Sequence, residues 1–218
     1  MGKPNPAHLK GRKKNGSGWF ITINTNRTAA KLGEEKIQDF KHVVQELFSL
    51  PENLAQIIVF RSDARTKDKR PETNMNPLEA LENYVCLPVS FEFCIERTQK
   101  SGDGSIHIHG ILGIHHFSNI QLDSKKIQDF IAEHWGKTVH VRFGGNLSNG
   151  IDTVFRTFPS ENQVFGIMKY AGKNIDLDGD YFGPVGQEYS KKEYLERYQE
   201  HSDDEEKSEK EDSDFDDI

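Results

Sequence analysis

The sequence predicts an α+β fold in which an antiparallel sheet is flanked by helices. Several short segments alternate apolar and polar residues, which is the period of a strand with two different faces. Longer segments repeat apolar residues every three or four positions, as amphipathic helices do. Two of the alternating segments are joined by a short loop with two glycines, which favours an antiparallel hairpin. The length of 218 residues fits one elaborated domain with appendages.

The N-terminal third of the chain predicts a strand, a helix and a second strand. Residues 19–24 alternate with the period of a strand. Residues 33–50 carry apolar side chains at helical spacing, and Pro51 lies beyond the last turn. Residues 56–60 form a short β-branched run. We therefore expect a β-α-β opening, followed by an exposed polar loop over residues 62–76.

The predicted hairpin comprises residues 89–96 and 105–113, joined by the loop at 98–104. Acidic and apolar residues alternate on its first strand, and two histidines alternate with apolar residues on its second strand. The side chains expected on its polar face are Glu92, Cys94, Glu96, His107 and His109. We expect His115 and His116 to be surface residues beyond the strand end.

The C-terminal half predicts two more helices around another strand. Residues 124–135 have a helical period, and residues 138–143 alternate as a strand. Residues 160–173 begin with a Ser-x-x-Gln capping box and continue with an apolar helical face. Tyr170 is therefore expected on this helix.

Charged residues divide the chain into a folded domain and two appendages. Residues 1–18 hold five basic and no acidic residues among several Gly and Pro, which predicts a flexible basic arm. Residues 19–187 hold the predicted domain, and residues 188–199 predict a short helix or linker. Residues 200–218 hold 11 acidic and 2 basic residues, which predicts a disordered acidic tail.

The net charge of −7 does not exclude a nucleic-acid partner, because the tail alone accounts for −9. Residues 1–199 hold 26 basic and 24 acidic residues, a balance of +2. Cys86 and Cys94 are too few for a disulfide framework and lack the spacing of a zinc site, which favours a reducing compartment. No segment approaches the roughly 20 apolar residues that cross a bilayer, and residues 1–4 open into a basic run with no apolar core behind it, so we expect no secretory signal. We expect an intracellular protein that is not secreted and has no membrane partner.

His107 and His109 predict a metal site. They are two residues apart on a strand, so their rings leave one face with Cα atoms about 7 Å apart and can converge on one cation. If the hairpin pairs as predicted, Glu96 or Glu92 lies on the same face and supplies a carboxylate. Two nitrogens and one carboxylate leave open positions on a divalent ion, as a catalytic metal requires. The alternative is a pair of surface histidines without a ligand.

Tyr170 and Lys173 form the second candidate pair. Their spacing of three places the phenol and the ammonium on the same surface of the predicted helix. A phenol with a pKa of about 10 is a weak nucleophile, but a nearby cation and a metal-bound electrophile can make it an effective one. The alternative is an exposed tyrosine beside a lysine, neither of which has a catalytic role.

Three segments, in this chain order, resemble the motifs of a known enzyme family. Residues 20–24 read Phe-Ile-Thr-Ile-Asn, residues 106–110 read Ile-His-Ile-His-Gly, and residues 170–173 read Tyr-Ala-Gly-Lys. They resemble the three motifs of the HUH replication-initiator endonucleases, the Rep proteins of circular single-stranded DNA viruses and rolling-circle plasmids. Residues 179–183, Gly-Asp-Tyr-Phe-Gly, resemble the segment that closes the nuclease domain of viral members. The resemblance covers residues 19–187.

The resemblance implies a central antiparallel sheet of about five strands flanked by helices, with an RNA-recognition-like topology. It also implies Mg²⁺ or Mn²⁺ as the cofactor. The matching positions for its ligands are His107, His109 and Glu96, with Glu92 as the fallback.

The resemblance further implies a covalent mechanism for nicking DNA. Tyr170 would attack the scissile phosphorus, giving a 5′-phosphotyrosine link and a 3′-hydroxyl, while Lys173 would hold the phosphate by charge. The same site can run backwards and join the ends. The expected function is therefore site-specific nicking and joining of single-stranded DNA that initiates rolling-circle replication.

Further residues are candidates for contacts with DNA. Thr22 and Asn24 lie on the polar face of the first strand, where structural support of the sheet is the alternative role. Arg142 and Lys169 supply positive charge that can follow the phosphate backbone. The expected partners are single-stranded DNA at a stem-loop origin, together with a helicase or host replication proteins.

Other functional classes fit the sequence less well. The only partial match to the phosphate-binding loop of a helicase, at residues 136–138, lies at a predicted helix end, so we expect one nuclease domain without a motor. A cupin-like metal enzyme also uses a His-x-His motif, but that motif continues with a glutamate a few residues later. Residues 110–116 of this chain hold no glutamate, which counts against this class. A non-catalytic origin-binding or RNA-binding module of the same fold is the main alternative. We expect the protein in the host nucleus if the virus infects a eukaryote, and otherwise in the cytoplasm.

Overall fold

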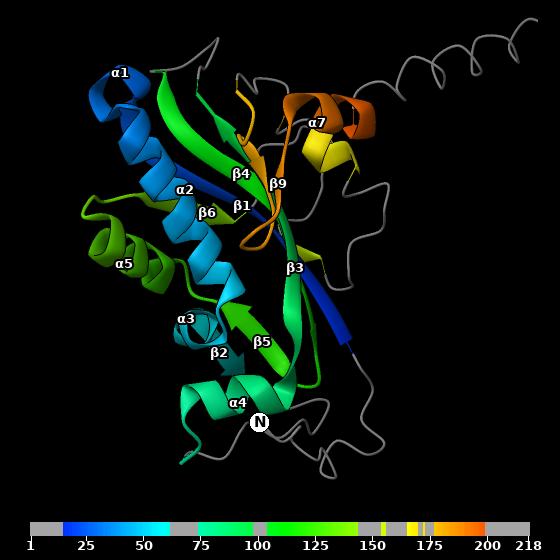
Figure 1. Cartoon of the computed structure of the whole chain (residues 1–218). Helices are drawn as coiled ribbons and strands as arrows, with labels where there is room; N and C mark the ends of the chain where they lie inside the picture. The colour runs from blue at the N-terminus through cyan, green and yellow to red at the C-terminus, as the bar shows by residue number, and fades with distance from the viewer. Residues whose placement is uncertain are drawn as a thin grey trace, which may run out of the picture.

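The computed structural model describes residues 15–61, 74–97, 104–143, 154–155, 165–169, 172 and 177–198. These residues form an α+β fold with a central antiparallel sheet flanked by helices, which confirms the predicted fold class (Figure 1). Most of the predicted basic arm and the whole predicted acidic tail lie outside the described residues. No helix in the described part of the chain is both long enough and apolar enough to cross a membrane.

The central sheet holds seven strands among the described residues, more than the five or so expected. Six of them follow the order β6-β1-β4-β3-β8-β9, and β7 pairs with β1. Every pair of neighbouring strands is antiparallel. The strands are β1 (Asn15–Thr28), β3 (Val85–Glu96), β4 (Ser105–His116), β6 (His140–Phe143), β7 (Val154–Phe155), β8 (Tyr181–Phe182) and β9 (Glu188–Tyr189).

The three long strands β1, β4 and β3 lie side by side at the centre of the sheet. The predicted hairpin is confirmed, because β3 pairs antiparallel with β4. β1 is longer than the predicted strand: it begins at Asn15, and residues 15–18 pair with the end of β4. β4 in turn continues to His116, whose Nε2 lies 2.8 Å from Ser17 Oγ. His116 is buried, so its prediction as a surface residue is wrong.

The described helices lie around this sheet and at its ends. They are α1 (Ala29–Leu32), α2 (Glu34–Ser49), α3 (Pro51–Ile57), α4 (Pro77–Tyr84), α5 (Ser124–Trp135) and α7 (Lys191–Tyr198), and residues 165–169 form one more helical segment. The predictions for α2 and α5 are confirmed to within one residue at each end. The last predicted helix corresponds to α7.

The predicted β-α-β opening is not a unit of one sheet. The second strand, β2 (Ile58–Arg61), does not join β1 but pairs with β5 (Asn119–Leu122) in a separate two-stranded sheet. Helix α3 lies between α2 and β2 and was not expected. Pro51 stands at its first turn, where the missing N–H of proline costs nothing, so this proline begins a helix as well as ending one.

One face of the central sheet is covered by α2 and α5 (Figure 1). Apolar side chains of these helices interlock with those of β1, β3 and β4 in the main core. Phe40 of α2 packs on Trp135 of α5 with ring centroids 4.6 Å apart, and the indole N–H of Trp135 donates to the carbonyl of Lys36. These contacts bury the apolar side chains that β1, β3 and β4 direct toward the two helices.

The opposite face carries a smaller apolar cluster. It is formed by Phe20, Cys94 and Ile111 from the sheet, Ile167 and Met168 from the helical segment 165–169, Tyr181 from β8 and Tyr194 from α7. In Figure 1 this yellow segment lies next to the orange α7, on the side of the sheet away from α2. We call this the second-face cluster. It covers only part of the face, and the histidines of β4 lie beside it.

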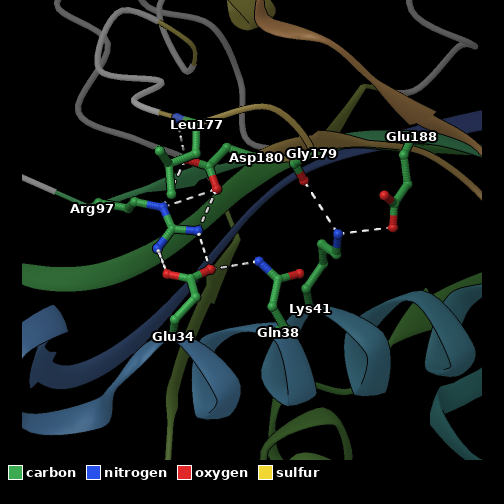
Figure 2. A network of polar contacts seen from close by, with 8 residues as sticks. All are labelled: Glu34, Gln38, Lys41, Arg97, Leu177, Gly179, Asp180 and Glu188. Carbon is green, nitrogen blue, oxygen red and sulfur yellow. Dashed lines mark hydrogen bonds and ion pairs between the residues drawn. The ribbon is translucent and has the colours of Figure 1, made fainter.

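A buried ion pair fastens the C-terminal segment to the rest of the domain (Figure 2). Arg97, directly after β3, donates from Nε to both carboxylate oxygens of Asp180, at 2.9 and 2.8 Å, and from Nη2 to Oδ1 at 2.7 Å. Its Nη1 donates to Glu34 Oε2 of α2 at 2.6 Å. Asp180 is completely buried and also accepts from the backbone N–H of Leu177. Burial opposes the charge on Arg97, but these carboxylates outweigh it and raise its pKa.

Two further side chains of α2, Lys41 and Gln45, join this helix to the segment around β8 and β9. Lys41 Nζ donates to Glu188 at 2.8 Å and to the carbonyl of Gly179 at 3.4 Å (Figure 2). Gln45 donates to the carbonyl of Gly183 at 3.2 Å. These polar side chains are buried on α2, so the loop that carries Asp180 is held from one side along two turns of the helix.

We expect Asp180→Asn to lower the free energy of unfolding by about 3–5 kcal/mol, because the variant leaves a buried guanidinium without its carboxylate. Glu34→Gln is the matched control. Glu34 pairs with the same guanidinium but its side chain is half exposed, so its loss should cost less than about 1 kcal/mol. Urea unfolding followed by circular dichroism measures both values. Equal losses for the two variants would contradict this account of the ion pair.

Candidate functional site

The second face of the sheet carries two rows of polar side chains across four strands. One row reads His140, Asn24, His107 and Glu96 from β6 to β3. The other reads Arg142, Thr22, His109 and Cys94. Directly opposed residues in antiparallel strands share a face with their Cβ atoms roughly 5 Å apart. The antiparallel register therefore brings the two histidines next to Glu96.

His109 lies between a carboxylate and a hydroxyl. Its Nε2 is 3.1 Å from Glu96 Oε2, and its Nδ1 is 3.1 Å from Thr22 Oγ1. The ring of Phe20 stacks beside it, with centroids 6.1 Å apart. These contacts fix the imidazole plane and turn Nε2 toward Glu96.

His107 stacks parallel to His109, with ring centroids 5.5 Å apart and an interplanar angle of 6°. Its Nδ1 lies 2.5 Å from the carbonyl oxygen of Ser105. A carbonyl only accepts hydrogen bonds, so this Nδ1 carries the proton, and in the neutral ring the lone pair is on Nε2. Both histidines thus use Nδ1 for support from the protein, as metal-ligating histidines commonly do.

The donor set fits a divalent cation in its chemistry. His107, His109 and Glu96 are only 5%, 9% and 7% exposed, so two imidazoles and a carboxylate are gathered in a partly dry site. Adjacent ligands about 2.1 Å from an octahedral ion lie roughly 3 Å apart, which is the separation of His109 Nε2 and Glu96 Oε2. Over the described ranges no three His, Cys, Asp or Glu side chains are already converged as a complete metal-binding group.

Glu92, the fallback ligand, lies elsewhere on the face. It is opposite Ile111 and four residues before Glu96 on β3. Its Oε2 accepts a hydrogen bond from the Tyr181 hydroxyl at 2.7 Å. Glu96 Oε2 thus contacts His109, whereas Glu92 Oε2 contacts the Tyr181 hydroxyl.

Cys94 faces His109 across the strand pair but does not join the polar group. It is completely buried in the second-face cluster. Burial, above all, raises the pKa of its thiol well above the usual value. The thiol therefore stays protonated at neutral pH and is neither a nucleophile nor a metal ligand in that state.

The glycine that follows the second histidine, Gly110, is required by the close packing of β4 on β3. A Cβ at this position would overlap the ring of Phe93 and the carbonyl oxygen of Glu92. Only glycine therefore allows β4 to approach β3 as closely as it does here. The contact keeps His109 in register beside Cys94 and one step from Glu96.

The structure separates the predicted DNA-binding residues into two groups. Thr22 belongs to the histidine site through its contact with His109, and the Asn24 carboxamide accepts from the N–H of Asn26 at 2.6 Å, which supports the local backbone. Arg142 and Lys169 are exposed. Arg142 is the outer neighbour of Thr22 on β6, so its charge lies at the edge of the second face of the sheet, which we call the histidine face because it carries His107 and His109.

Tyr170 and Lys173 lie outside the described residues, as does most of the helix predicted over residues 160–173. The structure does describe the helical segment that ends at Lys169. Its residues Ile167 and Met168 are fully buried in the second-face cluster, which includes Ile111. The chain immediately before Tyr170 thus packs on the face that carries the histidines.

Sequence reasoning missed the residues that hold this face together. Arg97 and Asp180 are 83 positions apart, and no local pattern connects them. Tyr194 was also missed, although Ser190-x-x-Glu193 just before it is a capping-box pattern that marks the start of α7. In the structure Glu193 N donates to Ser190 Oγ at 3.2 Å, and Ser190 N donates to Glu193 Oε2 at 2.7 Å.

The chain matches no protein-family model, no curated protein and no solved structure.

In the metal-free protein we expect His107 to carry a proton on Nδ1, because the Ser105 carbonyl can only accept. Nitrogen-15 NMR of the imidazole rings measures the protonation of each nitrogen. His109 is the internal comparison, since the Thr22 hydroxyl at its Nδ1 can either donate or accept. An unprotonated Nδ1 on His107 would contradict the geometry described above.

Proposed function

We propose that the protein is a metal-dependent endonuclease that nicks and rejoins single-stranded DNA through a tyrosine. The observation that carries the proposal is the cluster of His107, His109 and Glu96 on a sheet face against which the segment preceding Tyr170 is packed. The order of the three sequence motifs supports it independently. Its cellular role would be the initiation of rolling-circle replication at a stem-loop origin.

In this proposal His107, His109 and Glu96 hold Mg²⁺ or Mn²⁺. When bound, the ion would act as a Lewis acid on the scissile phosphate and offset the charge that builds on its oxygens. Thr22 and the Ser105 carbonyl orient the two imidazoles through their Nδ1 atoms. Because His107, His109 and Glu96 are mostly buried, the charge of a cation held there would be poorly screened and would act strongly on a phosphate at the site.

Tyr170 is the proposed nucleophile. Its phenolic oxygen forms a bond to phosphorus as the bond from phosphorus to the 3′-oxygen breaks. The phenolic proton leaves the tyrosine, and the departing 3′-oxygen ends as a hydroxyl. One phosphodiester replaces another, so the reverse reaction rejoins the strand. Lys173 would hold the phosphate by charge.

Single-stranded DNA would cross the face along its exposed cations. Arg142 stands on β6 at one edge, and Lys169 ends the helical segment that packs on the face. The basic N-terminal arm adds charge outside the described residues. These contacts are to phosphates, so they give affinity without base specificity.

A cupin-like enzyme is not supported, because cupins are double-sheet jelly rolls and this sheet is a single layer with helices. A non-catalytic DNA- or RNA-binding module of the same fold is the remaining rival. It would bind nucleic acid through the same face without forming a covalent bond.

We expect wild-type protein with Mn²⁺ and a library of single-stranded stem-loop oligonucleotides to gain the mass of a DNA fragment, located at Tyr170 by peptide mapping. Tyr170→Phe should form no adduct, because it lacks the nucleophilic oxygen, but should still bind the DNA. Tyr189→Phe is the matched control and should react as the wild type does. Intact-protein mass spectrometry checks the adduct. Binding without any adduct across the library would establish the rival instead.

A further inference from the structure

We propose that Tyr194 of α7 is a positioning residue for the nucleophile, holding the chain on both sides of Tyr170 against the histidine face. The inference rests on the proposed function and deepens it. Tyr194 is fully buried, and it contacts Met168, two residues before Tyr170, and Gly172, two residues after it. Tyr194 lies outside the three sequence motifs.

The first contact is a hydrogen bond at the end of the helical segment. The Tyr194 hydroxyl donates to the carbonyl oxygen of Met168. The last carbonyls of a helix have no partner within it, and an unpaired carbonyl in a buried cluster is costly. The phenol therefore satisfies a buried carbonyl of this segment two residues before Tyr170.

The second contact is steric. Gly172 is buried directly on Tyr194, and a Cβ there would overlap the phenol ring and its hydroxyl. The glycine of the Tyr-Ala-Gly-Lys motif therefore has a packing reason. Any larger residue would push the chain away from Tyr194 and, with it, the flanking residues of the proposed nucleophile.

Tyr194 is itself seated on the sheet. Its ring meets that of Tyr181 edge to face, with centroids 4.8 Å apart, and it shares the second-face cluster with Cys94. Cys94 is the cross-strand neighbour of His109. One side chain thus connects the strand position opposite a histidine to both flanks of Tyr170.

Helix α7 is fixed at its start, so Tyr194 is a firm support. The Ser190 and Glu193 capping box closes its first turn, and the N–H of Lys191 donates to Asp178 Oδ1 at 2.8 Å. Asp178 lies two residues before Asp180, which is paired with Arg97. The reach of a nucleophile depends on such support, since a displacement of about 1 Å can cost on the order of 100-fold in rate.

The test compares Tyr194→Phe with the wild type and with Tyr189→Phe, which alters a tyrosine packed against the same cluster. We expect Tyr194→Phe to slow single-turnover adduct formation about tenfold or more, because the hydrogen bond to Met168 is lost while the ring is kept. DNA affinity in the absence of divalent metal should not change. Hydrogen exchange should quicken in residues 168–172 and not in β4. Tyr189→Phe should match the wild type in every measurement.

Gly172→Ala supplies an independent test of the steric contact. It should also slow adduct formation, and combining it with Tyr194→Ala should give a smaller loss than the sum of the two separate changes, because the overlap is then removed. Unchanged adduct rates in both Tyr194→Phe and Gly172→Ala would overturn the positioning role while leaving the nuclease proposal intact. A rate loss matched by an equal loss of DNA affinity would overturn it as well. A wild-type protein that forms no adduct would overturn both proposals.

Discussion

The antiparallel register of β1, β4 and β3 is the constraint on which the rest of the site depends. It places Asn24, His107 and Glu96 in one row and Thr22, His109 and Cys94 in the next. A shift of one residue in either pairing would turn one strand's side chains to the opposite face. The register is specified strongly because the other face of these strands is buried under α2 and α5. Hydrophobic burial on one side thus determines which polar groups meet on the other.

The second face is completed by elements that come late in the chain. The Arg97–Asp180 ion pair fastens the loop that leads into β8, and β8 in turn pairs with β3 beside Cys94. From there the chain continues to α7, whose Tyr194 supports the segment at residues 165–169. One buried guanidinium, directly after the candidate ligand Glu96, therefore connects β3 to the late elements that cover the second face.

Much of the fold was predictable because its longest elements carry strong local patterns. The period of two placed His107 and His109 on one face, and the period of 3.6 located α2 and α5. Short elements were missed: α3 and α4 have seven and eight residues, too few for a clear period, and β8 and β9 have two residues each. The choice of Glu96 over Glu92 as the neighbour of a histidine needed the exact register, and the partners of Asp180 and Tyr194 are far away in the sequence.

The most direct measurement is a titration of Mn²⁺ binding by electron paramagnetic resonance on three proteins: the wild type, Glu96→Gln and Glu92→Gln. Both variants remove one carboxylate charge from the same strand, but Glu96 contacts His109 and Glu92 contacts the Tyr181 hydroxyl. The account predicts one Mn²⁺ site in the wild type, an affinity at least about tenfold lower in Glu96→Gln, and an unchanged affinity in Glu92→Gln. Equal affinities in all three proteins, or a loss in Glu92→Gln alone, would contradict it.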